Sequence, residues 1–374
     1  MKTGGFRSWK RLRSRIPESV YTLSLDRRRL RGSPSLVGRG IANPVRSALG
    51  GSNPPPRAVA MRVRTYDEID PLAAFRLSVL SFGSAWDEAK VRRVRAHDRT
   101  YLEDFALYAV ERGQVLAQVV PRRLAVRTTG GVEEIGGLAG VCSHPAVWGR
   151  GFARRLIEAT HDRFRELGLS VSALTTSRNI RGYGVYAKLG YVDLAPFQQA
   201  IRQVTRRRAP KGYRLRAARR SDISTIHRLY RTHTRRMLAW TERPERALEW
   251  AVIRTRDYLE KYRIIQRGGN AVGYLRTRPD DGITMEEVVA PNAMDFRAAV
   301  ALMEAKAEAG IATVNWITAR SDAARFRSLG YTVDGPFPDT TMAISLVKEI
   351  RTNDLPRRFG GTSGKFVQYP TDDF

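Results

Sequence analysis

The sequence predicts an α/β protein, more closely a mixed-sheet α+β fold, built from two tandem copies of one domain. The order of elements is the first observation. Residues 61–204 read as strand, two helices, three antiparallel strands, helix, strand, helix and strand, which is typical of a mixed sheet flanked by helices. The second observation is a restart: Arg62-Val63-Arg64 returns as Arg214-Leu215-Arg216, and Leu189-Gly190-Tyr191 returns as Leu329-Gly330-Tyr331. A repeat of this length indicates two whole domains.

The predicted elements of the first copy follow from hydrophobic periodicity and turn residues. Glu111–Gln114 and Thr128–Gly131 are polar, Gly-containing breaks between apolar strands, and Gly168 ends an amphipathic stretch. The strands are expected at Arg62–Arg64, Ala106–Val110, Val115–Val120, Arg123–Arg127, Ile135–Cys142, Val171–Thr175 and Gln198–Val204, and the helices at Pro71–Leu77, Asp87–Arg99 and Arg154–Leu167.

Composition and the positions of Pro and Gly residues divide the chain into five predicted segments. The 374 residues suit two domains. The segments are a basic extension (1–60), a first domain (61–204), a linker broken by Pro and Gly (205–212), a second domain (213–350) and a C-terminal tail (351–374). Three interpretations of the extension stay open: a transit-like segment, a basic arm for polyanions, or a region upstream of a true start at Met61.

Charge and residue usage limit the classes of function. The net charge of +28 suggests a polyanionic partner. Residues 1–60, which lack periodicity and are predicted to be disordered, hold thirteen Lys or Arg against two acids, so much of the excess lies outside the predicted domains. No run reaches the roughly 18 apolar residues of a membrane span. A single cysteine, Cys142, excludes an intrachain disulfide and favours a cytoplasmic protein. No metal site is predicted, because the five histidines lack metal-binding spacing.

A glycine-containing turn between a strand and a helix carries the strongest chemical signal. The segment Gly149-Arg150-Gly151-Phe152-Ala153 joins the strand Ile135–Cys142 to the helix Arg154–Leu167. Glycines there let backbone N–H groups approach an anion, and the helix dipole favours negative charge. Arg150, Arg154 and Arg155 would add positive charge. A turn of this kind suits a pyrophosphate.

This segment resembles motif A of the GNAT acetyltransferases, in which a strand and a proline precede Q/R-x-x-G-x-G/A at a helix start. Pro145, Gly151 and Ala153 match the pattern, whereas Trp148 stands where the family has Gln or Arg. Motif B, an asparagine followed by Y-x-K-x-G-F/Y, is matched by Asn179 and Tyr186-Ala187-Lys188-Leu189-Gly190-Tyr191.

The resemblance implies an N-acetyltransferase that takes acetyl-CoA as co-substrate, uses no metal and acetylates a primary amine. Tyr186 would be the general acid that protonates the thiolate leaving group. Asn179 would contact the cofactor near its pantetheine arm, or cap a helix. The further cofactor-binding residues would be Val141, Cys142 and Ser143 along the pantetheine arm, and Gly149, Arg150, Gly151, Phe152, Ala153 and Arg154 at the pyrophosphate.

The general base and the acceptor are left open by the sequence. Glu133, Glu134 and His144 are candidate bases for removing a proton from the attacking ammonium. Asp87 and Glu88 favour a cationic amine if they border the acceptor site.

The second copy lacks the signature residues of the first. Arg297 stands in the place of Gly151, and Phe326 in the place of Tyr186. A degenerate GNAT-like domain that supports the first by packing is therefore expected. A motif-rich domain followed by a motif-poor one resembles the Eis-like acetyltransferases, but Lys348–Phe374 is too short for their sterol-carrier-like third domain. Their C-terminal carboxylate base is therefore not transferred to Phe374.

Two alternative functions remain open at this point. One is a basic protein that binds nucleic acid or ribosomes on a GNAT scaffold. The other is a GNAT enzyme that transfers a different acyl group, because the pyrophosphate turn is common to all coenzyme A thioesters.

Overall fold

The structure is a computed structural model and describes residues 61–83, 86–205, 208–255, 258–279, 283–306 and 309–372. The predicted extension, residues 1–60, lies outside these ranges. None of the helices within them is long and apolar enough to cross a membrane.

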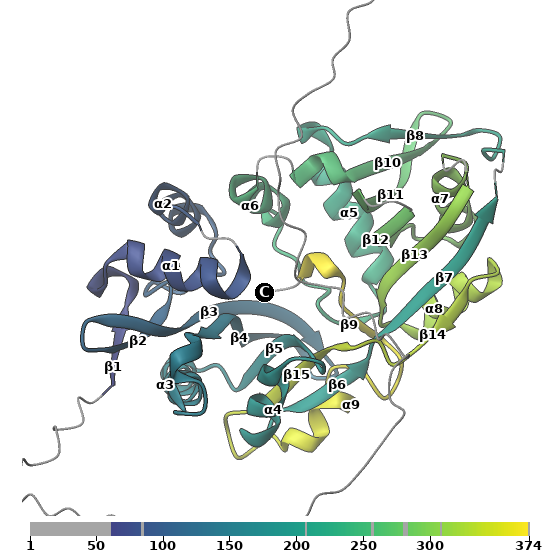
Figure 1. Cartoon of the computed structure of the whole chain (residues 1–374). Helices are drawn as coiled ribbons and strands as arrows, with labels where there is room; N and C mark the ends of the chain where they lie inside the picture. The colour runs from purple at the N-terminus through teal and green to yellow at the C-terminus, as the bar shows by residue number, and fades with distance from the viewer. Residues whose placement is uncertain are drawn as a thin grey trace, which may run out of the picture. The chain divides into compact units, whose positions relative to one another are not determined.

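The first sheet has the main strand order β1-β2-β3-β4-β5-β15-β6 (Figure 1). β4 and β5 pair in parallel, and the other neighbours along this order pair antiparallel. β9 (Leu238–Ala239) joins β3 to β16 (Phe366–Val367) at the side. The strands are β1 (Arg62–Thr65), β2 (Leu107–Glu111), β3 (Gln114–Thr128), β4 (Gly131–Ser143), β5 (Val171–Ser177), β6 (Val192–Pro196) and β15 (Asp339–Ser345).

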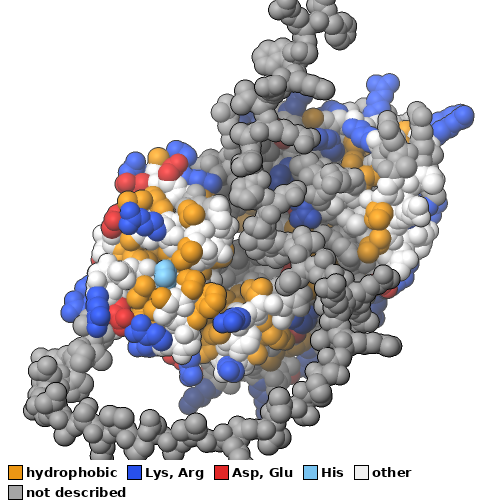
Figure 2. All heavy atoms as spheres, viewed as in Figure 1, with side chains coloured by type: hydrophobic (Ala, Val, Ile, Leu, Met, Phe, Trp, Pro, Cys, Tyr) orange, Lys and Arg blue, Asp and Glu red, His pale blue; other side chains and the backbone are white. Residues whose placement is uncertain are grey.

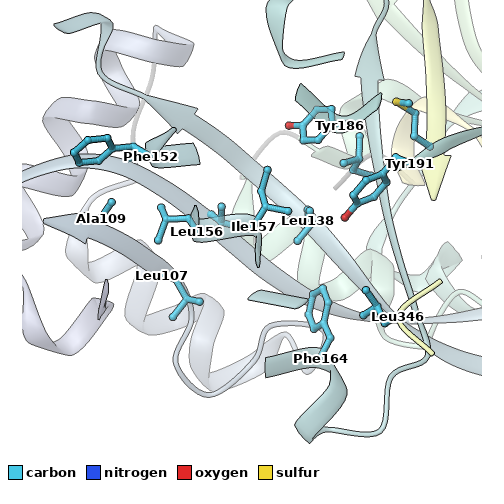
Figure 3. Packing of buried hydrophobic residues seen from close by; sticks show 14 of the residues in the cluster. Leu107, Ala109, Leu138, Phe152, Leu156, Ile157, Phe164, Tyr186, Tyr191 and Leu346 are labelled. Carbon is cyan, nitrogen blue, oxygen red and sulfur yellow. The ribbon is translucent and has the colours of Figure 1, made fainter. Parts of the chain in front are cut away.

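Helices cover both faces of this sheet. α1 (Pro71–Phe82) and α2 (Glu88–His97) pack on one face, in a cluster with Tyr108 and Phe105. α3 (Phe152–Glu166) and α4 (Arg181–Lys188) pack on the other, in the core shown in Figure 3. Gly136 allows α3 to approach, because a Cβ there would lie 2.3 Å from the ring of Phe164.

The second sheet has the order β14-β7-β13-β12-β11-β10-β8. β12 and β13 pair in parallel, as β4 and β5 do. Its strands are β7 (Gln198–Thr205), β8 (Tyr213–Ala217), β10 (Tyr262–Arg267), β11 (Asn270–Pro279), β12 (Ile283–Val289), β13 (Ala309–Ile317) and β14 (Thr332–Asp334). The helices of this half are α5 (Ile223–Thr234), α6 (Ala247–Arg254), α7 (Ala293–Glu304) and α8 (Arg320–Ser328). The predicted mixed α/β fold class is confirmed.

Besides the short strands β9 and β16, each sheet contains one long strand from the other half of the chain. β7 leaves the first half and pairs with β13 and β14 of the second sheet. β15 leaves the second half and lies between β5 and β6 of the first sheet. The predicted limits 61–204 and 213–350 describe the repeat in the sequence, whereas the sheets cross those limits.

The predicted tail, 351–374, packs into the fold over its described part. After α9 (Leu355–Arg358) the chain forms β16, with Phe359 and Phe366 fully buried. Gln368 is also fully buried and hydrogen-bonds Thr175 of β5 and Thr341 of β15. A short 3-10 turn, η6 (Pro370–Asp372), follows. Two aromatic side chains from this segment supply apolar surface to the core cluster beside β9.

One strand of the first sheet is longer than the sequence predicts. The strands expected at Val115–Val120 and Arg123–Arg127 form a single strand, β3, which runs through Pro121. Pro121 still pairs in register with Leu138, and the register shifts just before it, between Gln118 and Val120. A β-bulge therefore bends the strand at this point, and the strand is not interrupted.

Candidate active site

β4 and β5 separate after a short stretch of pairing. They pair only through Gly136 with Ser172 and Gly137 with Ala173, although β4 continues to Ser143. Gly140 has a φ of 53° and lies in the bulge between the pairs Gln118–Cys142 and Val120–Ala139. Among the strands that the structure describes, none pairs with the β5-facing edge of β4 beyond Gly137. Backbone groups of the predicted residues Val141, Cys142 and Ser143 on this edge can therefore bind an extended ligand.

The turn after β4 leaves the start of α3 open. Gly149 and Gly151 have φ values of 80° and 78°, in the left-handed region, and a Cβ on either would meet no atom within 4 Å. α3 begins at Phe152 with no side-chain cap and no acidic residue in its first turn. Its first N–H groups are therefore available to an anion.

The arginines of this turn are engaged with the protein itself. Arg150 binds Glu111 at 2.8 Å, and Arg154 binds Glu158 at 2.8 Å. Arg155 donates to the carbonyl of Arg150 at 3.1 Å. Backbone N–H groups, rather than these guanidinium groups, make the turn suitable for a phosphate in this state. Phe152 is buried, which fixes the first turn of α3 in the core.

Tyr186 lies on α4 and is buried in the same core as Leu138 and Phe152 (Figure 3). Its ring packs edge-on against Tyr191, with centroids 5.9 Å apart. Burial raises the pKa of Tyr186, and a charge on Cys142 would raise it further. The phenol therefore keeps its proton at neutral pH, as a general acid must.

Cys142 is a protonated thiol. Burial raises its pKa to about 11, although hydrogen bonds with Ser81 and Gln118 oppose the change. It lacks the thiolate character of a nucleophile at neutral pH.

A buried hydrogen-bond network that the sequence did not predict lies under this site. The Tyr191 hydroxyl is 2.7 Å from Nε2 of His161 and 2.7 Å from Oγ of Ser172. Burial lowers the pKa of His161 to about 4, with a smaller effect from Arg165. His161 is neutral, and it positions Tyr191 between α3 and β5.

The position of Asn179 is inconsistent with one of its two predicted roles, that of helix cap. It is exposed, its N–H lies 3.5 Å from Oγ of Ser177, and the N-cap of α4 is Ile180. Asn179 therefore does not cap the helix, and its side chain is exposed between the end of β5 and the start of α4.

The three candidate bases have different surroundings. Glu133 makes a two-point ion pair with Arg358, at 2.8 and 3.0 Å. His144 accepts the N–H of Ala146 at Nδ1. Glu134 is 57% exposed and lies 3.6 Å from Arg123. Glu134 is therefore the least constrained of the three, and the other two carry structural contacts.

A cavity of about 250 Å³ lies between the first sheet, α2 and α6. Arg122 and Leu124 of β3 line it, opposite Gly137 and Ile135 of β4. Because Gly136 faces α3 and successive strand residues face opposite sides, the cavity is on the face away from α3. The second half supplies aromatic and charged lining residues that the sequence analysis missed: Trp240, Glu242, Arg243, Trp250, Tyr258, Tyr262 and Asp372.

Within the described residues, the remaining charged groups form no cluster of the metal-ligand type. Among the described side chains no three His, Cys, Asp or Glu residues gather as metal ligands would. On the face that Figure 2 shows, the visible Lys and Arg side chains are scattered among apolar and acidic ones. Asp87 caps α2, with its carboxylate accepting the N–H of Lys90 at 2.7 Å, and Glu88 pairs with Arg92, so both have structural contacts.

Comparison with known proteins identifies the first half. The model of the acetyltransferase (GNAT) domain family matches residues 62–192. No curated protein sequence matches the chain significantly.

Solved structures share the fold over most of the chain. A GCN5-related N-acetyltransferase from Kribbella flavida is 20% identical, with a TM-score of 0.57 over 77% of this chain and 72% of that one. A GCN5-related N-acetyltransferase from Anabaena variabilis is 14% identical, with a TM-score of 0.55 over 77% and 73%. Eis1 from Mycobacterium abscessus is 17% identical, with a TM-score of 0.53 over 76% and 74%. At these identities the likeness is one of fold. Together with the strand separation and the open turn, the family match leads to one conclusion: residues 62–192 are a GNAT acetyltransferase domain, and the chain that carries them is an acyltransferase.

Proposed function

We propose that this protein transfers an acetyl group from acetyl-CoA directly to a primary amine. The observation that carries the proposal is the opening between β4 and β5, with an uncapped helix start at one end and the buried phenol of Tyr186 on α4. GNAT domains use an acyl-CoA as co-substrate, so the proposal adds the acetyl group and the amine.

The residues present suit a coenzyme A thioester. The pyrophosphate would accept hydrogen bonds from the backbone between Gly149 and Ala153, where two left-handed glycines leave open space. The edge of β4 at Val141, Cys142 and Ser143 would hydrogen-bond the pantetheine amides, with the Ser143 carbonyl shared with the indole N–H of Trp148. Asn179 would approach the same arm from the opposite side of the opening. Arg150 and Arg154 would exchange their carboxylate partners for phosphate or add long-range positive charge.

The bound thioester would supply an activated acyl group with a thiolate leaving group. Tyr186 would donate its phenolic proton to the leaving sulfur, and its raised pKa ensures that this proton is present at neutral pH. The buried phenol is a weak acid, and the thiolate that forms as the thioester breaks would be the base that accepts its proton. No covalent intermediate is needed, which agrees with the protonated thiol of Cys142.

The amine would arrive from the face of the sheet away from α3, through the cavity beside Arg122 and Leu124. This cavity begins opposite Gly137, the last residue of β4 that pairs with β5. A thioester lying in the opening would therefore be approached from the face that α3 does not cover. The cavity walls combine four aromatic rings with acidic and basic side chains, which suits an acceptor with an apolar body and a polar amine.

Glu134 is our candidate for the residue that receives the ammonium proton. It contributes to the lining of this cavity and is not locked in a two-point ion pair, unlike Glu133. Glu134 lies two residues before Gly136, so its side chain leaves β4 on the face that α3 covers and reaches the cavity from the rim. A water molecule would have to relay the proton if the amine binds deeper than this carboxylate reaches.

The test is calorimetric titration of the full chain with acetyl-CoA, followed by an assay of free thiol release with a panel of amines. In Tyr186→Phe we expect binding to be retained and turnover to fall by about 100-fold or more. Tyr183→Phe is the matched control, because Tyr183 lies on the same helix, is only partly buried and donates its hydroxyl hydrogen to Asp193 at 3.3 Å. Equal turnover in the two variants would remove Tyr186 from the reaction.

The same titration tests which acyl group is transferred and whether the protein is an enzyme or a basic binding protein. Tighter binding of a longer acyl-CoA than of acetyl-CoA would replace the acetyl group in the proposal. If no coenzyme A thioester binds, the enzyme proposal is wrong and the basic binding protein becomes the leading hypothesis.

A further inference from the structure

Trp148 has an exposed ring in an otherwise glycine-rich turn. Its side chain is 53% exposed, and its indole N–H donates to the carbonyl of Ser143, the last residue of β4, at 3.0 Å. This bond fixes the ring at the end of the strand with much of its surface open to solvent. A fixed and exposed aromatic ring next to a phosphate-binding turn is suited to stacking against another ring.

Arg181 meets this ring from the other side of the opening. It is the first residue of α4, and its guanidinium carbon lies 4.9 Å from the centroid of the Trp148 ring. The two residues thus bring together the end of β4 and the start of α4, where the strands have separated. Arg181 makes no ion pair with any carboxylate in the described part of the chain, whereas Arg150 and Arg154 do.

We propose that Trp148 and Arg181 bind the 3′-phosphoadenosine end of the acyl-CoA: the indole stacks on adenine and the guanidinium pairs with the 3′-phosphate. This inference rests on the proposed function, because it needs the pyrophosphate at Gly149–Ala153. In coenzyme A the ribose with its 3′-phosphate and adenine follows directly after the pyrophosphate. The residue next to that turn is Trp148, and the free cation beside it is Arg181.

The contact between Arg181 and the indole can give way to this ligand. A cation above an exposed ring is held weakly, whereas a guanidinium paired with a phosphate makes charge-assisted, often two-point hydrogen bonds. On binding, adenine takes the place over the indole and Arg181 turns to the phosphate. The pair would therefore select complete coenzyme A thioesters over acyl groups carried on pantetheine alone.

The experiment compares acetyl-CoA with acetyl-3′-dephospho-CoA in calorimetric titrations of the full chain. The parent protein should bind acetyl-CoA about tenfold or more tightly than the dephospho compound, the range of one charged hydrogen-bond contact. Arg181→Gln should bind the two compounds equally, at the level of the dephospho compound. Arg327→Gln is the matched control, because it removes one exposed positive charge from α8, the corresponding helix of the second half, and should keep the preference.

Tryptophan fluorescence tests the stacking. Acetyl-CoA should quench the emission of the parent, Trp148→Phe should lose most of that quenching, and acetyl-pantetheine, which lacks adenine, should quench neither protein. The inference is overturned if the parent binds acetyl-CoA and its dephospho form equally well, if Arg327→Gln loses the preference as Arg181→Gln does, or if Trp148→Phe keeps the quenching. Failure of the parent to bind any of these thioesters would instead refute the proposed function, and with it this inference.

Discussion

The two halves build the start of the corresponding helix in opposite ways. In the first half α3 follows a left-handed glycine, Gly151, and has no side-chain cap. In the second half Asn292 caps α7 by accepting the N–H of Asp295 at 2.8 Å. Asp295 is itself buried and accepts a hydrogen bond from Tyr213 at 2.8 Å. The same position in the fold is therefore open to an anion in one half and filled by a carboxylate in the other.

The place where the two parallel strands separate, beside each helix, is also more occupied in the second half than in the first. β12 and β13 pair from Ile283 to Met285 and then separate, but Tyr369 from the C-terminal segment lies at the opening. Its hydroxyl is 3.2 Å from Nε2 of His233 and 3.3 Å from Asp322. The cavity left there measures only about 10 Å³. Phe326 occupies the place of Tyr186 and has no proton to donate.

This comparison separates what the fold provides from what the side chains provide. Both halves have a parallel strand pair that separates and a helix beginning nearby, but in the described residues Asn292 caps the second helix and Tyr369 lies at the second opening, whereas α3 has no side-chain cap. We therefore propose that the second half binds no thioester and that its role is to pack against the first half and to supply one wall of the acceptor cavity.

The largest effect should come from making the first helix start resemble the second. Gly151→Glu introduces a carboxylate at the N-cap of α3, the place that Asn292 has in α7, so the structure aligns Gly151 with Asn292 and not with Arg297 as the sequence repeat predicts. At about 4 Å from a phosphate this carboxylate would cost about 4 kcal/mol at an effective dielectric of 20, so we expect affinity for acetyl-CoA to fall by about 1000-fold. Titration calorimetry would measure the loss.

Gly168→Glu is the matched control for this variant. Gly168 follows the other end of α3, has a φ of 72°, and a Cβ there also meets no atom within 4 Å. The same strain and charge are therefore introduced away from the phosphate site. If Gly168→Glu weakens binding as much as Gly151→Glu, the loss reflects damage to the fold and not to the turn.

A large effect on stability should come from the ionic cluster of the second half. Nε of Arg243 lies 2.6 Å from Asp372 and its Nη2 lies 2.8 Å from Glu287, which is fully buried. Arg243→Met would leave two buried carboxylates facing each other, so the free energy of unfolding should fall by at least about 3 kcal/mol. Urea denaturation would measure this fall.

Arg246→Met provides the comparison for that experiment. Arg246 is 62% exposed and pairs with Glu249, so its removal should change stability by less than about 0.5 kcal/mol. Equal stability of the two variants would mean that the buried cluster contributes nothing beyond a surface pair.

The fold class and the glycine turn could be predicted because local sequence determines them. A strand, a glycine turn and an amphipathic helix are encoded within about twenty consecutive residues, as for Gly149–Ala153, and the structure has the turn in that place. Tyr186 was found in the same way, through the spacing of a short motif.

The strand exchange and the cavity could not be predicted, because they depend on contacts between distant residues. β15 reads as an ordinary strand of the second half, and only its pairing with β5 assigns it to the first sheet. Gln368 belongs to the predicted C-terminal tail, yet its amide is buried between Thr175 and Thr341. Periodicity reports which side of an element is buried, and it does not report the partner.

A pH-dependent difference should distinguish the cores of the two halves. In the first half the hydroxyl of Tyr191 contacts neutral His161. In the second half the hydroxyl of the corresponding tyrosine, Tyr331, lies 3.0 Å from Glu304. Burial lowers the pKa of His161 to about 4, so as the pH falls the unfolded chain takes up the proton first. Stability should therefore decline as the pH falls from about 6.5 to about 4, by about 3 kcal/mol from this group.

His161→Gln should flatten that part of the stability curve, measured by urea denaturation between pH 4 and pH 8. His97→Gln, which changes an exposed histidine at the end of α2, should leave the slope as in the parent. The interpretation fails if His161→Gln shows the parent slope, whatever its stability at neutral pH, because the slope reports the proton and not the lost hydrogen bond.

The smallest effect should come from removing the cap that only the second half has. Asn292→Ala deletes the side-chain oxygen that accepts the N–H of Asp295, and loss of a helix cap of this kind costs about 1 kcal/mol. Asn292→Ser keeps a capping oxygen and should retain most of that stability in urea denaturation. Asn292→Ala should still bind a single acetyl-CoA per chain in calorimetry, because the carboxylate of Asp295 and the ring of Tyr369 would continue to occupy the second opening. A second binding event in this variant would mean that the Asn292 cap alone prevents the second half from binding acetyl-CoA.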